Sequence, residues 1–178
     1  GRGTGCGLDR YDNQRINISY LDDEWSTNPK MNAENKIDGV KFLDAGIIDI
    51  SHRHKKLYHQ RIKKTKPIVP LKKFMSLQDQ SKHKYLIYIE GNSLAYRLGF
   101  MLKNKSVIIY VKSRYTPWFY YYLRHKKNCV MVKSDLSDLY DAILWLKKND
   151  DKAQEIAENG YKLYRKHLTL NKMLEYME

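Results

Sequence analysis

Three short apolar runs in the second half of the chain constrain its fold more than any other feature. They are Tyr85 to Ile89, Ser106 to Val111 and Cys129 to Val132. Each is strand-sized and almost continuously apolar, as expected of strands covered on both faces. Helix-like segments follow them, and we predict these at Leu94–Lys103, Tyr115–Arg124 and Leu136–Lys148. The alternation predicts an α/β fold with a Rossmann-like parallel sheet and flanking helices.

Polar residues before these segments supply the expected helix caps. Asn92 or Ser93 would cap the first helix, and Ser134 or Asp135 the third. A last long helix capped by Asp150 or Asp151 keeps apolar positions at helical spacing to Leu168. In the first half we predict an irregular region to Lys36, a strand at Gly46–Ile50 within the stretch Phe42–Ile50, a basic helix ending at Thr65 and a short helix within Leu71–His83.

Length and composition fit a single domain over residues 1–178, because 42% of the residues are hydrophobic. The longest apolar run is far shorter than the roughly 20 residues that span a bilayer, so we predict no membrane span. Cys6 and Cys129 lie too far apart in the sequence to indicate a zinc site or a disulfide framework. A single bridge between them stays open.

The formal net charge of +13 favours a polyanionic or phosphate-bearing partner. RNA, an anionic membrane and a sugar nucleotide all qualify. Much of the excess lies between Lys41 and Lys84, and a solvated basic face would also explain it.

Four glycines among residues 1–7 predict a loop whose backbone can approach a ligand closely. The chain opens on Gly-Arg-Gly without Met, and we expect a further N-terminal part to precede it.

Several motifs together resemble glycosyltransferase family 90, which includes protein O-glucosyltransferases and fungal capsule xylosyltransferases. The central motif is Lys-Tyr followed by an apolar run, with Gly91 and Arg97 spaced as in the family. Further matches, in the family's order along the chain, are Arg2-Gly3-Thr4-Gly5, Asn13-Gln14-Arg15, Asp44-Ala45, Ser113-Arg114-Tyr115, Trp118-Phe119-Tyr120, Val132 to Leu139 and Asn149 to Gly160.

The resemblance implies the donor-binding half of a GT-B-type enzyme that has two Rossmann-like domains. It implies an inverting transferase that moves glucose or xylose from a UDP-sugar to a protein or glycan hydroxyl. The acceptor domain with the catalytic base would precede residue 1, so the catalytic residues are unknown from this chain. The ending Glu-Tyr-Met-Glu differs from an endoplasmic-reticulum retention signal, and we therefore expect a cytoplasmic location.

The expected donor site gathers around Gly91 and Arg97. A glycine at a helix start lets phosphate approach free N–H groups, and the planar arginine fork suits a diphosphate. Thr4 and Arg15 would meet the diphosphate from the other side. The full predicted set is Arg2, Gly3, Thr4, Arg15, Gly91, Asn92, Ser93, Leu94, Ala95, Arg97, Ser113, Lys133 and Asp135.

Neither a metal nor a cofactor is expected beside the UDP-sugar. The sequence contains no Asp-x-Asp motif, and the family resembled uses arginines and a helix end in place of a divalent ion. Pro117 stands where relatives commonly place a Glu, which leaves the contacts to the donor sugar open.

Structural roles compete with several of these assignments. Gly91 also suits a plain turn, Asp135 a helix cap and the aromatic residues Trp118 to Tyr122 core packing. Asp44 is the strongest candidate for a base within the chain, although a structural hydrogen bond explains it as well. Two other functions remain open: a nucleic-acid-binding module built on Lys41–Lys84, with nucleic acid the less expected partner, and an inactive glycosyltransferase-like scaffold.

Overall fold

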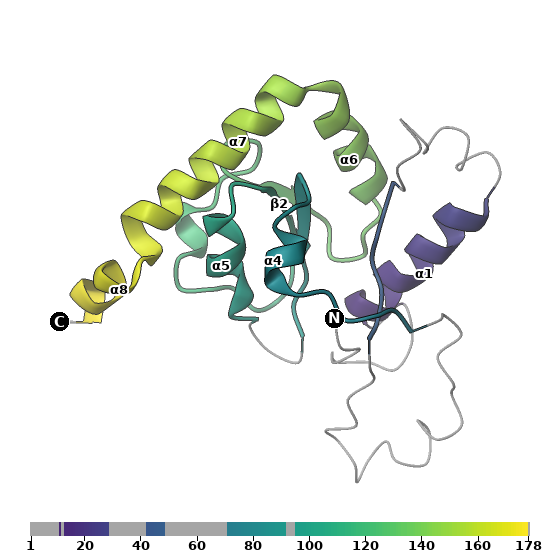
Figure 1. Ribbon diagram of the computed structural model, residues 1–178, viewed down its shortest axis with the longest axis horizontal. Helices are drawn as coiled ribbons and strands as arrows, with labels where there is room; N and C mark the ends of the chain where they lie inside the picture. Colours follow the sequence, from purple (N-terminus) through teal and green to yellow (C-terminus); the bar gives the residue numbers. More distant parts are fainter. Residues whose placement is uncertain (1–10, 12, 29–41, 49–70, 92–94, 178) are drawn as a thin grey trace, which may run out of the picture. The chain divides into compact units, whose positions relative to one another are not determined.

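The computed structural model describes residues 11, 13–28, 42–48, 71–91 and 95–177 (Figure 1). The chain divides into two compact units, residues 1–74 and 75–178, and each is described by itself. The prediction of one donor-binding domain over the whole chain therefore stays a prediction.

The first unit contains α1, Gln14–Thr27, where the sequence predicted irregular structure. The side chain of Asn13 caps this helix by accepting hydrogen bonds from the N–H groups of Arg15 (3.0 Å) and Ile16 (3.3 Å). The prediction was wrong because half of the buried positions of α1 are polar, which hides the helical hydrophobic period. Those positions are Ile18, Ser19, Asp22 and Trp25.

The strand predicted at Gly46–Ile50 is absent from its described part, residues 46–48. A side chain holds the backbone there, since Asp22 accepts a hydrogen bond from the N–H of Ala45 at 2.9 Å. The Ile47 carbonyl accepts another from the N–H of Lys72 at 2.8 Å. Phe42 instead packs edge-on against Trp25 of α1, with ring centroids 5.7 Å apart. The glycine-rich start and the predicted basic helix lie outside the described residues.

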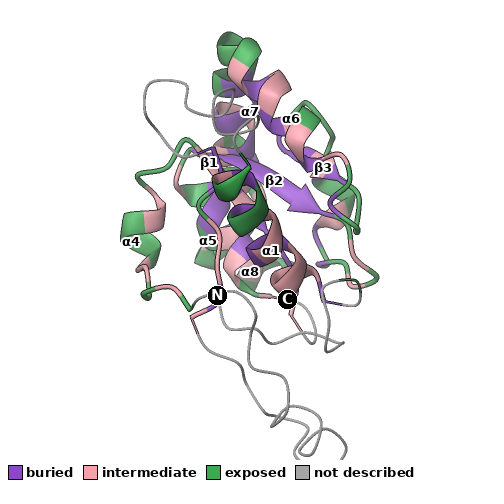
Figure 2. Ribbon diagram, turned by 90° about the vertical axis from the view of Figure 1, so that its right-hand side faces the viewer, coloured by how far each residue is buried: buried purple, intermediate pink, exposed green. Residues whose placement is uncertain are grey.

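A parallel sheet forms the centre of the second unit, and it confirms the strands predicted from the apolar runs. Its strands are β1 (Tyr85–Tyr88), β2 (Val107–Val111) and β3 (Val130–Val132), in the order β1-β2-β3. Tyr88 pairs with Tyr110 and Val111 with Val132. Every residue of β2 is buried, as Figure 2 shows, which explains why the central strand reads as an unbroken apolar run.

Helices α5 (Arg97–Lys103) and α7 (Asp150–Leu163) cover one face of this sheet. The buried side chains of α5 and Leu163 of α7 join Tyr88 and Tyr110, whose rings stack at 5.4 Å, in one hydrophobic core. Gly160 allows a close approach there, because a Cβ at this position would lie 3.0 Å from the carbonyl oxygen of Asn128. Helix α6 (Leu139–Lys148) packs against β3 and α7.

Three short helical elements complete the second unit. Helix α4 (Leu77–Gln80) is capped by Ser76, whose hydroxyl accepts a hydrogen bond from the N–H of Asp79. The predicted last helix is divided into α7, a π-helical turn (Tyr164–Leu168) and α8 (Leu170–Met177). None of the described helices is long and apolar enough to cross a membrane.

The helix predicted over Tyr115–Arg124 is wrong, because only Tyr120–Tyr122 forms a short 3-10 turn, η2. Phe119 and Leu123 point into the core, whereas Trp118 and Tyr121 are exposed. Residues 115–124 therefore pack on the core through the side chains of Phe119 and Leu123 and not through one face of a helix. The core role expected for the aromatic run holds only for Phe119 and, in part, for Tyr120, which packs against the same core.

Candidate functional site

The carboxyl ends of the three parallel strands bring several predicted site residues to one edge of the sheet. Gly91 follows β1, Ser113 follows β2, and Lys133 follows β3. Because the strands are parallel, these segments share one edge, where open α/β sheets bind their ligands. The structure therefore places segments separated in the sequence where a ligand can meet all three.

Arg97 is the first residue of α5, which corrects the prediction of a helix beginning at Leu94 and capped by Asn92 or Ser93. The N-cap is Tyr96, which makes no side-chain capping hydrogen bond. A helix of only seven residues offers little dipole, so the anion-binding end predicted after Gly91 is not present in that form. The cation at this place is the Arg97 guanidinium itself.

The guanidinium of Arg97 is partly buried, and the protein uses few of its hydrogen-bond donors. One terminal nitrogen lies 3.4 Å from the carbonyl oxygen of Ile89, which is the outer limit of a hydrogen bond. Its Nε is buried and has no hydrogen-bond partner within the described ranges. Burial lowers the pKa of Arg97, while Tyr88 and Glu90 act in the opposite direction.

Glu90 is a buried acid beside Arg97 that the sequence analysis missed, with 4% of its surface exposed. One carboxylate oxygen accepts a hydrogen bond from the Tyr88 hydroxyl (2.6 Å), and the other accepts one from the N–H of Ala95 (2.7 Å). Burial and this acid raise the pKa of Tyr88. An acidic residue directly after a buried strand and before Gly91 was the available signal.

The remaining predicted residues of this edge have local partners. The Ser113 hydroxyl closes a turn, since it accepts from the N–H of Tyr115 and donates to its carbonyl, both at 3.0 Å. Lys133 is exposed, and its N–H donates to Asp138 at 2.8 Å.

Asp135 closes a turn and does not cap a helix, which corrects the prediction of a helix starting at Leu136. Its carboxylate accepts a hydrogen bond from the N–H of Ser137 at 3.0 Å, and this bond lowers its pKa. Helix α6 begins only at Leu139. The delay has a backbone cause: Leu136 is buried with φ of 65°, which an α-helix cannot contain.

A histidine side chain accepts a hydrogen bond from the backbone of β3, the edge strand of the described sheet. The Nδ1 atom of His125 accepts a hydrogen bond from the N–H of Met131 in β3 at 3.0 Å. Burial lowers the pKa of His125, and the charges of Lys126 and Lys112 lower it further, against the opposite effect of Asp138. The neutral imidazole that this acceptor role needs is thereby favoured.

Six predicted residues lie outside the described ranges: Arg2, Gly3, Thr4, Asn92, Ser93 and Leu94. Arg15 belongs to the first unit, where its N–H meets the cap Asn13. Gly91, Ala95, Arg97, Ser113, Lys133 and Asp135 belong to the second unit. Their role in donor binding stays a prediction.

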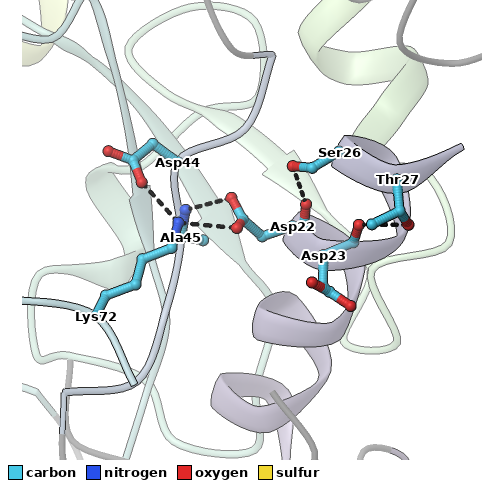
Figure 3. A network of polar contacts seen from close by, with 7 residues as sticks. All are labelled: Asp22, Asp23, Ser26, Thr27, Asp44, Ala45 and Lys72. Carbon is cyan, nitrogen blue, oxygen red and sulfur yellow. Dashed lines mark hydrogen bonds and ion pairs between the residues drawn. The ribbon is translucent and has the colours of Figure 1, made fainter. Parts of the chain in front are cut away.

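Asp44 does not stand as an isolated carboxylate, because it belongs to a network within the first unit (Figure 3). The Lys72 ammonium lies 2.7 Å from Asp44 and 2.8 Å from the buried Asp22. Burial lowers the pKa of Lys72, but hydrogen bonds to both carboxylates outweigh it and raise the pKa overall. The structural explanation of Asp44 therefore has direct support.

No three His, Cys, Asp or Glu side chains gather into a possible metal site among the described residues. Cys129 is a buried free thiol, whose pKa burial raises to about 12. Independence from metal stays a prediction.

Viral proteins and animal enzymes resemble this chain in sequence. Uncharacterized protein 179R of Invertebrate iridescent virus 6 is 32% identical over 189 residues, which cover 100% of this chain and 16% of that protein. Protein O-glucosyltransferase 2 of Danio rerio is 39% identical over 99 residues, 56% of this chain and 20% of the enzyme. Protein O-glucosyltransferase 1 of Homo sapiens is 33% identical over 109 residues, 61% of this chain and 28% of the enzyme. The chain thus spans less than a third of each relative's length.

A solved structure confirms the predicted fold class, a Rossmann-like half of the GT-B type. The C-terminal domain of the glycosyl transferase group 1 family protein LpcC from Francisella tularensis matches with a TM-score of 0.55 and 12% identity. The match covers 92% of this chain and 83% of that domain.

The family comparison agrees with the resemblance drawn from the motifs around Gly91 and Arg97. The model of glycosyl transferase family 90 matches residues 40–178, which include the whole parallel sheet and the helices that cover it. The chain therefore belongs to glycosyl transferase family 90.

Proposed function

We propose that this chain supplies the donor site of an inverting glycosyltransferase that uses a UDP-sugar, with glucose or xylose as the sugar. The observation that carries the proposal is the state of Arg97, a partly buried cation at the carboxyl edge of the sheet whose Nε has no partner in the described part of the chain. Buried polar groups normally have partners, so an unused arginine donor at a ligand-binding edge calls for a ligand. A diphosphate matches the planar donor fork of arginine.

In this proposal Arg97 stabilises the leaving diphosphate. Negative charge builds on the leaving group as the bond to the sugar breaks, and a fixed cation there lowers the barrier. Gly91 gives the backbone room beside the phosphates, and Ser113 and Lys133 flank the same edge. We expect no divalent ion to be needed for donor binding.

The acceptor is a protein or glycan hydroxyl in this proposal, and its activation belongs elsewhere. A base must lie within about 3 Å of that hydroxyl, on the side of the sugar opposite the leaving group. We place this base on an acceptor domain outside residues 1–178. Membership of the family and similarity to protein O-glucosyltransferases support the transferase role. A cytoplasmic location remains a prediction.

Calorimetric titration of UDP in the presence of a chelator tests the donor site. We expect binding without added metal, and we expect Arg97→Ala to weaken it by roughly 1.5–3 kcal/mol, the range for a hydrogen bond to a charged group. The matched control is Arg165→Ala, which removes an exposed arginine from the π-helical turn.

Two results would contradict the proposal. Equal affinity of wild type and Arg97→Ala would remove Arg97 from the site. Failure of the folded wild-type chain to bind UDP or a UDP-sugar, with or without Mn²⁺, would favour the inactive scaffold. Binding that appears only with Mn²⁺ or Mg²⁺ would instead reject the metal-free mechanism alone.

A further inference from the structure

Three hydrogen bonds join the end of β1 to Ala95 and Arg97 at the start of α5, and a fourth links Tyr88 to Glu90 within the end of β1. Glu90 accepts from the Tyr88 hydroxyl (2.6 Å) and from the N–H of Ala95 (2.7 Å). The Tyr88 hydroxyl also lies 2.8 Å from the carbonyl oxygen of Ala95. Arg97 adds the long bond to Ile89. We call the group formed by Tyr88, Glu90 and the backbone of Ala95 the Glu90 clasp.

The core fixes the strand side of the clasp, whereas its other side, Ala95, is held by the clasp itself. Tyr88 has no exposed surface, and its ring stacks on Tyr110 inside the core. Ala95, by contrast, lies before the helix, which begins only at Arg97. The hydrogen bonds of its N–H and carbonyl groups are therefore made to the side chains of Glu90 and Tyr88. The position of Ala95, and with it the entry to Arg97, is therefore set by Glu90 and Tyr88.

A count of hydrogens shows what the clasp requires of residue 90. The Tyr88 hydroxyl has one hydrogen but two acceptors beside it, an oxygen of Glu90 and the carbonyl oxygen of Ala95. A glutamine at position 90 would satisfy these three contacts with one hydrogen each. Its amide oxygen would accept from Ala95, its NH₂ group would donate to Tyr88, and Tyr88 would donate to Ala95.

We propose that Glu90 is a positioning residue for the donor site, which holds Ala95 and Arg97 where an anionic diphosphate can use them. This inference rests on the proposed function. Without the clasp, the N–H of Ala95 and the Tyr88 hydroxyl lose their shared buried acceptor, and Arg97 starts a helix with no side-chain cap. The conformation of Ala95 and Arg97 that binds the ligand then becomes one of several. The apparent dissociation constant rises in inverse proportion to the fraction of molecules in that conformation.

We infer that Glu90 acts through the hydrogen bonds that it accepts and not through its negative charge. A second negative charge beside a diphosphate is unfavourable in itself, so an acid at this place is explained by what its oxygens hold. Glutamine should therefore replace Glu90 without loss of binding, and alanine should not.

Three variants and one control test this inference by UDP titration. Glu90→Ala should weaken UDP binding by about tenfold or more, equivalent to roughly 1.4 kcal/mol. Glu90→Gln should bind within about threefold of wild type, or more tightly. Tyr88→Phe should fall between the two. The control is Glu158→Ala in α7, which changes the net charge as much as Glu90→Ala does. It removes an exposed carboxylate that pairs with Lys105, and it should bind UDP like wild type.

Hydrogen exchange of the Ala95 amide provides a second readout that needs no ligand. We expect protection in wild type and Glu90→Gln, and its loss in Glu90→Ala, while the β2 amides stay protected in all three. Loss of β2 protection as well would mean that Glu90 serves general folding, and the inference would fail. Circular dichroism confirms that each variant is folded.

The outcomes separate this inference from the function on which it rests. If wild type binds UDP and Glu90→Ala binds equally well, the positioning role is wrong and the donor site stands. If wild type does not bind UDP while Ala95 protection follows the expected pattern, the donor site fails and the clasp is only structural. Weak binding by both Glu90→Ala and Glu90→Gln would show that the charge matters, and would overturn the assignment to hydrogen bonding.

Discussion

Asp22 and Asp44 contact the same ammonium group, that of Lys72, but differ in burial. The side chain of Asp22 is 6% exposed and that of Asp44 is 45% exposed. Asp22 also accepts a hydrogen bond from the backbone of Ala45, so it ties α1 to residues 42–48. Asp44 has solvent as an alternative partner. The two carboxylates should therefore differ strongly in what they contribute to stability.

We expect Asp22→Ala to lower the free energy of unfolding of the first unit by roughly 2–4 kcal/mol, because it leaves the N–H of Ala45 without its acceptor and removes the buried partner of Lys72. Asp44→Ala should cost less than about 1 kcal/mol, as for exposed ion pairs. Urea titration followed by Trp25 fluorescence measures both, in a background where Trp118 and Trp145 are replaced by Phe. Equal effects would mean that burial does not distinguish the two acids.

At the residue scale the sequence led to Arg97 but not to Glu90. Arg97 could be proposed because a glycine and an arginine at a set spacing after a buried strand form a pattern along the chain. The contacts of Glu90 depend on where Ala95 returns after positions 91–94, and no periodicity expresses that. Asp44 shows the converse, because its partner Lys72 lies far along the chain and only the fold brings them together.

Two helical glycines offer a direct comparison of helix propensity with packing. At Gly99 in α5 a Cβ would meet no atom of the described residues within 4 Å, apart from its own chain neighbours and helix backbone. Gly160 in α7 is buried, and a Cβ there would lie 3.0 Å from the Asn128 carbonyl oxygen and 3.2 Å from a methyl group of Leu102. Gly99 only lowers the helix propensity of α5, whereas Gly160 is required by the close approach of α7 to the Asn128 carbonyl and to Leu102 of α5.

Gly99→Ala should raise the free energy of unfolding by about 0.5–1 kcal/mol, the propensity difference between the two residues. Gly160→Ala should lower it by about 1–3 kcal/mol, because the backbone oxygen of Asn128 cannot easily move and overpacking outweighs propensity. Thermal and urea unfolding of the two variants decide this. Stabilisation by Gly160→Ala would show that α7 can shift away from the turn at Asn128.

At the element scale the strands were predictable and the helix beginnings were not. A parallel strand buried on both faces is apolar along its length, so β1, β2 and β3 are visible in the sequence. Polar residues after a strand favour a helix cap and a turn equally, and at Asp135 the turn prevailed because Leu136 adopts a positive φ. Helix α1 was missed because Ser19 and Asp22 occupy its buried face.

The net charge of the whole chain, +13, fits both a phosphate ligand and a nucleic acid. Residues 49–70, which hold the two basic runs of Lys41–Lys84, lie outside the described residues. The described edge of the second unit instead presents Arg97, whose Nε has no hydrogen-bond partner among the described residues. The charge therefore needs a test that separates local recognition from general attraction.

Salt dependence provides this test for the whole chain. A protein that neutralises five phosphates of single-stranded RNA loses affinity with a log–log slope of about −3.5, which is roughly several hundred-fold between 50 and 300 mM NaCl. UDP has no condensed counterion atmosphere to release, so screening alone should weaken its binding by about threefold over that range. We expect UDP binding to persist at 300 mM NaCl and to be weakened in Arg97→Ala by the roughly 1.5–3 kcal/mol given above, whereas any RNA binding fades with salt and is insensitive to Arg97. RNA binding that survives 300 mM NaCl, in a chain that does not respond to UDP, would establish the nucleic-acid module in place of the donor site.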